Sequence, residues 1–186
     1  MSRRDGPPRE VRIIGGQWRR SKLPVADRPG LRPTPGRVRE TLFNWLGQDL
    51  SGWRVLDAFA GSGALGFEAA SRGAAEVWLL EQDPALAASL EATRKRLGGE
   101  AMHVLRADAL AWMARATPAT FDLVLLDPPF GARLSDAALK LALPLLTPSG
   151  SIYLEAAEPV DALPEPLVER RRLRAGAVSA QWLALH

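Results

Sequence analysis

Residues 55–66, which read VLDAFAGSGALG, decide the fold of this chain. An apolar strand candidate ends at Asp57, a glycine-rich turn follows it, and a helix candidate begins at Ala64. Gly61, Gly63 and Gly66 give the spacing G-x-G-x-x-G, and residues without a Cβ let a ligand lie against the backbone. This strand–turn–helix context predicts a binding loop for a nucleoside cofactor in a Rossmann-like α/β domain.

Glu81 supports this interpretation because it lies twenty residues after Gly61, at the end of the next strand candidate. A carboxylate there accepts hydrogen bonds from both hydroxyls of a ribose. The loop alone is compatible with a dinucleotide or with S-adenosylmethionine. Asp57 favours S-adenosylmethionine, because a carboxylate repels a pyrophosphate but tolerates amino and sulfonium cations. Asp108 follows the third strand candidate beside Ala109, where it can cap a helix or lie at an adenine edge.

The rest of the chain alternates apolar runs with helical patterns, which predicts a mostly parallel sheet covered on both faces. We expect strands at residues 53–56, 77–80, 102–105, 121–126 and 151–155, and helices at residues 35–46, 64–71, 84–97, 108–115 and 135–146. Residues 167–185 lack helical spacing and predict an antiparallel hairpin. With 186 residues, 47% of them hydrophobic, the chain has the size and composition of one globular domain.

Composition excludes several classes of protein. The chain has no cysteine, which rules out a disulfide scaffold, a thiolate nucleophile and cysteine-bound zinc or iron–sulfur sites. Two histidines are too few for a multi-histidine metal centre. No apolar run reaches the ~20 residues of a membrane helix, and the first ten residues lack the apolar segment of a signal peptide. We expect a cytoplasmic protein without a metal or a membrane contact.

Charge is distributed unevenly along the chain. Residues 1–40 contain 11 basic and 4 acidic residues, whereas the other 146 residues contain 13 basic and 17 acidic ones. A basic segment on an acidic body favours a polyanionic partner such as a nucleic acid, and a solvated leader is the alternative. The segment includes a strand-like run at residues 11–14, and Trp18 beside Arg19 is either a stacking platform or a core residue. We expect a basic N-terminal extension over residues 1–34 and one domain over residues 35–186.

The helix expected at residues 35–46 places four polar residues within about a quarter of its circumference, at ~100° per residue. They are Arg37, Glu40, Thr41 and Asn44. This group is either an ordinary solvated face or a set of donors and acceptors beside the binding crevice.

Residues 127–130 read DPPF and directly follow the buried strand candidate at residues 121–126. Ligands of open α/β sheets bind at the carboxyl ends of the strands, where this tetrapeptide is expected. Proline restricts the residue before it to extended geometry, so the motif fixes the Asp127 carboxylate and the Pro128 carbonyl as convergent acceptors. These acceptors match the two N–H donors of an exocyclic amine and free its lone pair to attack a methyl group, while Phe130 offers a stacking surface for the base.

The sequence resembles the bacterial 16S rRNA (guanine-N2)-methyltransferases of the RsmD type over residues 12–155. The resemblance rests on RIIGGQWR at residues 12–19, RPT at 32–34, RVRETLFN at 37–44, FAGSGALG at 59–66 and DPPF at 127–130. It implies a seven-stranded methyltransferase fold, S-adenosylmethionine as methyl donor, and a guanine amine of small-subunit rRNA as acceptor. Residues 20–21 and 177–185 depart from the family pattern.

We therefore expect a Rossmann-like α/β methyltransferase with a mostly parallel seven-stranded sheet, a C-terminal antiparallel hairpin and a short basic N-terminal extension. The residues expected to bind S-adenosylmethionine are Asp57, Phe59, Gly61, Ser62, Gly63, Glu81, Asp108, Ala109, Thr41 and Asn44. Those expected to be catalytic are Asp127, Pro128, Pro129 and Phe130. Those expected to contact RNA are Arg12, Trp18, Arg19, Arg20, Lys22, Arg32 and Arg37.

The expected partner is 16S rRNA or the assembling small ribosomal subunit, and the expected state of the protein is a monomer. Three alternatives stay open at this point. They are an adenine-N6 methyltransferase of DNA, a nicotinamide-dependent oxidoreductase, and a catalytically silent RNA-binding module.

Overall fold

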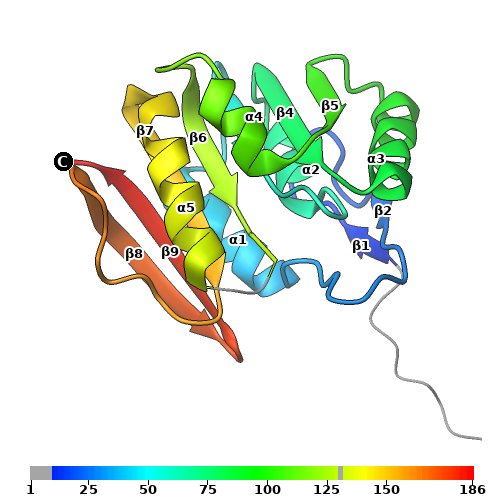
Figure 1. The fold of residues 1–186 in the computed structure, drawn as a ribbon. Coiled ribbons are helices and arrows are strands. Elements are labelled where there is room, and N and C mark those ends of the chain that lie inside the picture. The colour runs from blue at the N-terminus through cyan, green and yellow to red at the C-terminus, as the bar shows by residue number, and fades with distance from the viewer. Residues whose placement is uncertain (1–9, 130–131) are drawn as a thin grey trace, which may run out of the picture.

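The computed structural model describes residues 10–129 and 132–186, so Phe130 lies outside the described residues. The main sheet has seven strands (Figure 1), in the order β5 (Met102–Arg106), β4 (Glu76–Glu81), β3 (Arg54–Asp57), β6 (Phe121–Leu126), β7 (Leu146–Ala156), β9 (Val178–Leu185) and β8 (Leu167–Ala175). The first five pair in parallel, and β9 pairs antiparallel with both β7 and β8. The predicted α/β fold, with its C-terminal hairpin, is confirmed.

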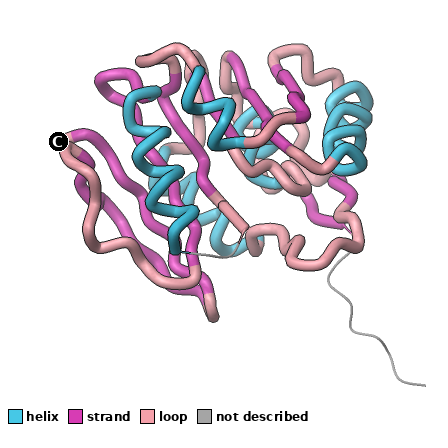
Figure 2. The backbone as a smooth tube through the Cα atoms, in the orientation of Figure 1, coloured by secondary structure: helices cyan, strands magenta, loops and turns pink. Residues whose placement is uncertain are grey.

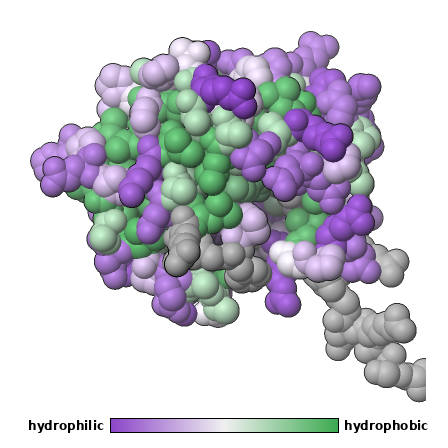
Figure 3. All heavy atoms as spheres, viewed as in Figure 1, coloured by the Kyte–Doolittle hydropathy of each residue, from purple (hydrophilic) through white to green (hydrophobic). Residues whose placement is uncertain are grey.

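Helices cover both faces of this sheet (Figure 2). They are α1 (Gly36–Leu46), α2 (Ala64–Ser71), α3 (Pro84–Leu97), α4 (Ala109–Arg115) and α5 (Ala132–Ala142). One buried cluster joins α1, α2 and α3 to one face through Leu42, Phe67 and Leu79. A second cluster joins α4 and α5 to the other face through Met113 and Leu139. Figure 3 shows this second side, with apolar side chains along α5 and hydrophilic ones over α3.

Local signals explain where the helices begin and end. The expected bounds of α3 are confirmed. The helix begins where Asp83 caps its first turn by accepting a backbone N–H at 2.8 Å, and it ends before Gly98, which has a φ of 69°. The helix α5 ends earlier than expected, at Ala142, and a 3-10 turn, η1 (Leu143–Leu145), follows. Pro144 explains this difference because it has no N–H to continue the helical hydrogen bonds.

Residues 10–24 form a small antiparallel hairpin beside α2 and α3 (Figure 1). Its strands are β1 (Glu10–Arg12) and β2 (Lys22–Pro24). The first overlaps the strand-like run at residues 11–14, whereas the second has no counterpart among the expected elements. Ile13 and Leu23 lie in the same buried cluster as Leu42 and Phe67. The described part of the N-terminal extension therefore shares the core of the domain.

A buried ion cluster of Glu68, Arg39 and Arg72 fastens this hairpin to α2. Glu68 is fully buried and forms ion pairs with Arg39 at 3.4 Å and with Arg72 at 3.0 Å. The same carboxylate accepts the backbone N–H groups of Ile14 and Gly15, each at 2.9 Å. The negative charge of Glu68 is thus compensated by two cations and two backbone donors, as a buried charge requires.

Arg39 and Ser71 make further contacts with the N-terminal hairpin and the loop that follows it. Arg39 donates to the carbonyl oxygens of Arg12 at 3.0 Å and Thr34 at 3.1 Å. Gly16 lies so close to α2 that a Cβ there would be 1.8 Å from the carbonyl oxygen of Ser71, and its φ of +77° also favours glycine. The hairpin is therefore held against α2 by both polar contacts and close packing.

Candidate active site

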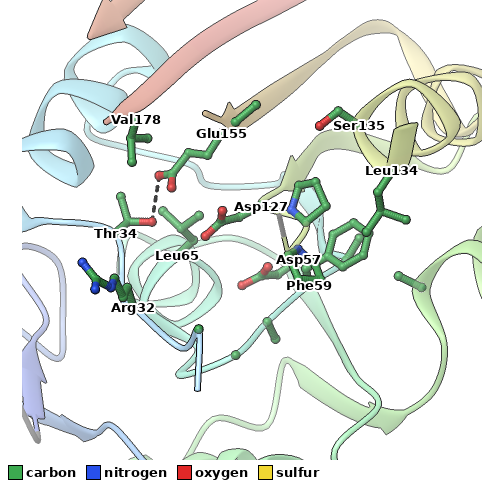
Figure 4. A pocket seen from close by; sticks show the side chains of 18 of the residues that line it. Arg32, Thr34, Asp57, Phe59, Leu65, Asp127, Leu134, Ser135, Glu155 and Val178 are labelled. Atoms are coloured by element: carbon green, nitrogen blue, oxygen red, sulfur yellow. Dashed lines mark hydrogen bonds between the residues drawn. The ribbon is translucent and has the colours of Figure 1, made fainter. Parts of the chain in front are cut away.

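A cavity of about 1900 Å³ opens at the carboxyl ends of β3, β4, β6 and β7 (Figure 4). Open α/β sheets bind their ligands at this edge, and sites for one small molecule typically measure about 300–1,000 Å³. Residues 28–35, between the N-terminal hairpin and α1, form one wall of the cavity, and α5 contributes to another. The cavity has room for a cofactor and a nucleic-acid base together.

The three glycines of the loop have different roles. Gly61 lines the cavity at a φ of +54°, and a Cβ there would meet a single side chain, at 3.0 Å. A Cβ on Gly63, which precedes α2 at a φ of +82°, would lie 2.6 Å from the ring of Phe67. A Cβ on Gly66 would lie 2.1 Å from Leu79 on β4. A ligand can therefore approach the backbone at Gly61. Gly63, which was expected at the cofactor, instead permits close packing of Phe67 and Leu90 and does not line the cavity, and Gly66 permits close packing of α2 on the sheet.

Glu81 ends β4 at the cavity, and the backbone holds its carboxylate in place. One oxygen accepts the N–H of Gly61 at 2.9 Å, and the other accepts the N–H of Asp83 at 3.0 Å. Because each carboxylate oxygen can accept more than one hydrogen bond, both keep acceptor capacity toward the cavity. This geometry suits the two hydroxyls of a ribose.

Most of the other residues expected at the cofactor also line the cavity. They are Asp57, Phe59, Ser62, Asp108 and Ala109. Asp108 additionally caps α4, because it accepts the N–H of Ala111 at 2.8 Å. Its two predicted roles are therefore compatible.

Thr41 and Asn44 lie elsewhere and do not line the cavity. Thr41 donates to the carbonyl oxygen of Arg37 at 2.9 Å, and Asn44 accepts a hydrogen bond from Gln48 at 2.6 Å. The opposite side of α1, which includes Leu42, is buried in the core, so these polar side chains face outward. The expectation that Thr41 and Asn44 bind the cofactor is therefore wrong. They belong to a solvated face of α1, which was the alternative expectation.

Three carboxyl groups meet in the cavity, and we call Asp57, Asp127 and Glu155 the acidic cluster. Asp57 ends β3, Asp127 follows β6 and Glu155 lies near the end of β7, so three adjacent strands bring them together. In Figure 4, Asp127 lies between the other two. Within residues 10–129 and 132–186, no ion pair joins any of the three to a lysine or arginine.

Burial without a cation raises the pKa values of the acidic cluster. Burial raises the pKa of Asp57 to about 7, although its Oδ2 accepts the N–H of Gly66 at 3.0 Å. Its Oδ1 is buried and has no hydrogen-bond partner in the described part of the chain. Burial, followed by the charges of Glu155 and Asp57, raises the pKa of Asp127 well above its usual value, and burial raises that of Glu155. Such a site favours a positively charged ligand.

Glu155 is anchored by two hydroxyl groups. Thr34 Oγ1 donates to Glu155 Oε1 at 2.7 Å, and the Tyr153 hydroxyl donates to the same oxygen at 2.6 Å. All three side chains are buried. The carboxyl group of Asp127 lies beside that of Glu155 (Figure 4), because Leu126 pairs with Leu154 across β6 and β7 and the two acids directly follow this pair. The loop before α1 is thereby connected, through Glu155, to the strand end beside the catalytic candidate.

The structure describes three of the four residues of the predicted catalytic motif, and these three lie at the cavity. Asp127, Pro128 and Pro129 all line it, together with Gly61 and Glu81 of the cofactor loop. The expected acceptor and donor sides of the reaction are therefore in one cavity.

Sequence reasoning missed Glu155 and its hydroxyl partners as members of the site. A signal was present, because the parallel strands β3, β4 and β7 each carry an acidic residue at or near their carboxyl end, namely Asp57, Glu81 and Glu155. A carboxylate at the end of an apolar strand lies at the ligand edge of the sheet. The donor to Glu155 could not be found this way, because Thr34 lies in a loop without regular structure.

The basic residues expected to contact RNA are all exposed. Arg32 lines the cavity, whereas Arg12, Arg19, Arg20, Lys22 and Arg37 lie outside it on the hairpin and on α1. Lys22 also forms an ion pair with Glu10 at 3.6 Å. Trp18 is half-buried and packs on Phe67 with the ring centroids 6.4 Å apart, which matches the alternative of a core residue.

The described residues contain neither a membrane-spanning helix nor a metal-binding cluster. None of their helices is long and apolar enough to cross a membrane. No group of three or more histidine, cysteine, aspartate or glutamate side chains among them could hold a metal ion.

Comparison with known proteins identifies the family of this chain. The family described as Conserved hypothetical protein 95 matches residues 11–183. Ribosomal RNA small subunit methyltransferase D of Escherichia coli K12 is 47% identical over 133 residues, which cover 71% of this chain and 66% of the relative. The protein of the same name from Haemophilus influenzae is 44% identical over 151 residues, which cover 78% of each chain.

Two solved structures share the fold. A candidate methyltransferase from Escherichia coli has a TM-score of 0.86 and 36% identity, covering 95% of this chain and 98% of that one. A candidate methylase from Haemophilus influenzae has a TM-score of 0.80 and 37% identity with the same coverage. The chain therefore belongs to the Conserved hypothetical protein 95 family, together with the ribosomal RNA small subunit methyltransferases D.

Proposed function

We propose that this protein transfers a methyl group from S-adenosylmethionine to the exocyclic N2 amine of a guanine in 16S ribosomal RNA. The observation that carries the proposal is the meeting of Asp127, Pro128 and Pro129 with Gly61 and Glu81 in one cavity. The names of the Escherichia coli and Haemophilus influenzae relatives support the same class of acceptor. The reaction belongs to the cytoplasm, where the small ribosomal subunit is assembled.

The chemistry of the cavity fits S-adenosylmethionine. The buried Asp57 Oδ1 lacks a donor among the described residues, and a ligand ammonium group would supply one. Glu81 would hold the ribose hydroxyls, and Asp108 would lie at the adenine. When bound, S-adenosylmethionine supplies a methyl group on a positively charged sulfur. A cation beside the acidic cluster also favours the ionised forms of its carboxyl groups.

Asp127 and the Pro128 carbonyl would hold the guanine amine for attack. As both N–H groups donate to these acceptors, the nitrogen lone pair leaves conjugation with the ring and becomes a nucleophile. The C–N bond would form as the C–S bond of the bound methyl donor breaks, and the electron pair of the C–S bond would stay on sulfur. Because the nitrogen gains positive charge on the way, the Asp127 carboxylate stabilises the transition state more than the bound substrate. The guanine must be unpaired or extruded, since N2 inside a duplex cannot reach the cavity.

The exposed basic residues of the hairpin and of α1 would bind the RNA backbone. Arg32 supplies charge at the cavity itself, and Arg12 and Arg19 supply it on the exposed surface of the hairpin. Neutralising phosphates releases counterions, so RNA binding should weaken as salt rises. The double variant Arg12→Gln/Arg19→Gln should bind RNA more weakly and with a smaller salt slope. A matched double variant on β5 and α4, Arg106→Gln/Arg115→Gln, should keep the wild-type slope.

The function is tested by methyl incorporation from labelled S-adenosylmethionine into unmethylated 16S rRNA, free and within small subunits. Nucleoside analysis should find the label in N2-methylguanosine. Labelled N6-methyladenine in DNA would support the adenine methyltransferase instead. Tighter binding of NAD than of S-adenosylmethionine would support the oxidoreductase. RNA binding without any label in either substrate would leave an RNA-binding module.

A further inference from the structure

We propose that Asp127 and Glu155 share one proton and together accept the proton that the guanine amine releases, with Glu155 as the positioning residue. This inference rests on the proposed function and concerns the same cavity. It starts from the placement of the two carboxyl groups: Asp127 and Glu155 directly follow the paired residues Leu126 and Leu154, lie side by side in the cavity (Figure 4), and have no cation paired to them within the described residues. Like charges in contact disfavour joint ionisation, so such a pair carries one negative charge rather than two.

The surroundings of Glu155 decide which residue of the pair holds the shared proton. Glu155 Oε1 accepts hydrogen bonds from the hydroxyls of Thr34 at 2.7 Å and Tyr153 at 2.6 Å. These two donors stabilise the charged form of Glu155, whereas no hydroxyl donor to the Asp127 carboxyl group is found among the described residues. In the free protein the shared proton therefore lies on Asp127 and the charge on Glu155.

The groups around the pair do not neutralise it. Asp57 from β3 and Tyr153 from β7 face it, and neither carries positive charge. Arg32 in the loop before α1, Asp136 and Lys140 on α5, and Glu158 after β7 also line the cavity. The last four side chains are exposed, and no ion pair joins Arg32 or Lys140 to the pair within the described residues.

This arrangement resolves a conflict in the amine-binding role of Asp127. A protonated Asp127 donates a hydrogen bond, whereas an arriving amine needs an acceptor. If the shared proton moves to Glu155, Asp127 becomes the acceptor and the pair keeps its single charge. After methyl transfer the cationic nitrogen loses a proton: its N–H bond breaks, an O–H bond forms on Asp127, and the pair becomes neutral. The pair then returns this second proton to water.

The test is the pH dependence of the single-turnover methylation rate with saturating RNA and cofactor. The wild-type rate should rise with pH through the apparent pKa of the pair. In Glu155→Gln, Asp127 keeps only Asp57 as a neighbouring carboxyl group, so this rise should move to lower pH by about one unit or more and the plateau rate should fall. In Thr34→Val, Glu155 loses a donor to its charged form, so the rise should move to higher pH.

Two variants serve as controls. Thr34→Ser keeps the hydroxyl and should restore the wild-type profile. Glu76→Gln makes the same carboxyl-to-amide change at the amino end of β4 and should leave the profile unchanged. A purely structural role of Glu155 predicts lower plateau rates with the rise at its wild-type pH. That result, in both Glu155→Gln and Thr34→Val, would overturn the proposal.

Infrared spectra of the free protein give a readout that does not depend on catalysis. Near neutral pH, one protonated carboxyl band should disappear in Asp127→Asn and also in Glu155→Gln, because each change removes one holder of the shared proton. Persistence of the band in both variants contradicts the shared proton. A wild-type protein that shows the band but makes no N2-methylguanosine would contradict the proposed function and leave the pair established.

Discussion

The described residues contain two groups of buried or half-buried carboxylates, and their surroundings differ. In the buried ion cluster, Glu68 has two arginine partners and two backbone N–H donors. In the acidic cluster, Asp57, Asp127 and Glu155 have no lysine or arginine partner within residues 10–129 and 132–186, and their pKa values are raised. The first cluster is complete without a ligand, whereas the second needs a cation or a proton. The difference separates a carboxylate that holds the fold together from carboxylates that are placed for chemistry.

The largest effect is expected from removing the charge of the buried ion cluster. Glu68→Gln leaves Arg39 and Arg72 buried without an anion, which should lower the free energy of unfolding by about 3–5 kcal/mol. Denaturant titration of the folded protein measures this loss. As a control, Glu91→Gln removes an exposed partner of Arg94 and should cost about 1 kcal/mol or less. An equal loss of unfolding free energy in the two variants would show that the buried ion cluster does not hold the fold together more than an exposed ion pair does.

The second effect is on catalysis at the acidic cluster. Asp127→Ala should slow single-turnover methylation at least ~100-fold, which corresponds to about 2.7 kcal/mol. Because the carboxylate acts mainly in the transition state, the loss should appear in the rate more than in RNA affinity. Binding of S-adenosylmethionine, measured by calorimetry, should barely change. A near wild-type rate would remove Asp127 from the mechanism.

The third effect is on cofactor binding. Glu81→Ala should weaken S-adenosylmethionine binding by about 1.5–3 kcal/mol, the range for hydrogen bonds to charged groups. Calorimetry measures the change directly. Glu76→Ala, at the opposite end of the same strand, should leave the affinity unchanged. Unchanged affinity in the Glu81 variant would place the ribose elsewhere.

The smallest expected effect is a gain in stability, in contrast to the loss expected for Glu68→Gln, and it concerns Asp57 of the acidic cluster. The pKa of Asp57 is about 7 in the folded protein, against about 3.9 in an unfolded chain. Between these values the folded protein binds more protons, so stability falls as pH rises from about 4 to 7. Asp57→Asn removes this cost, at most about 4 kcal/mol at 1.36 kcal/mol per pKa unit, and should raise the free energy of unfolding at pH 8 by about 1 kcal/mol once the loss of the native side chain is subtracted.

Denaturant titrations at pH 8 and at pH 4.5, without cofactor, measure this prediction. The gain of Asp57→Asn over the wild type should shrink at the lower pH, where the wild-type carboxyl group is already protonated. A variant that is less stable than the wild type at pH 8 would show that Asp57 behaves like Glu68.

The sequence was informative where a motif and its place on a strand agreed. The turn after β3 and the tetrapeptide after β6 identified the fold and the cavity, because strand ends in an open α/β sheet share one edge. Thr41 and Asn44 were placed wrongly for a physical reason: helical spacing shows which residues share a face, but not whether that face meets a ligand or water. The structure shows that the opposite face of α1 is the buried one.

Tertiary contacts also decide the role of several charged residues. Arg39 counts toward the basic N-terminal segment, yet it is buried against Glu68 and is not available to RNA. No local pattern marks a partner 29 positions away. The same holds for Thr34 and Glu155, whose hydrogen bond forms only because the loop before α1 crosses the ends of the strands.

The contact between Thr34 and Glu155, 121 positions apart, also sets an order of assembly during synthesis of the chain. The N-terminal hairpin can dock once α2 and Arg72 have been made, whereas the carboxyl pair must wait for β7. Contacts between distant residues form late in folding because they close long loops. A nascent chain therefore gains its basic hairpin well before its catalytic pair, and a chain interrupted before residue 155 lacks that pair altogether.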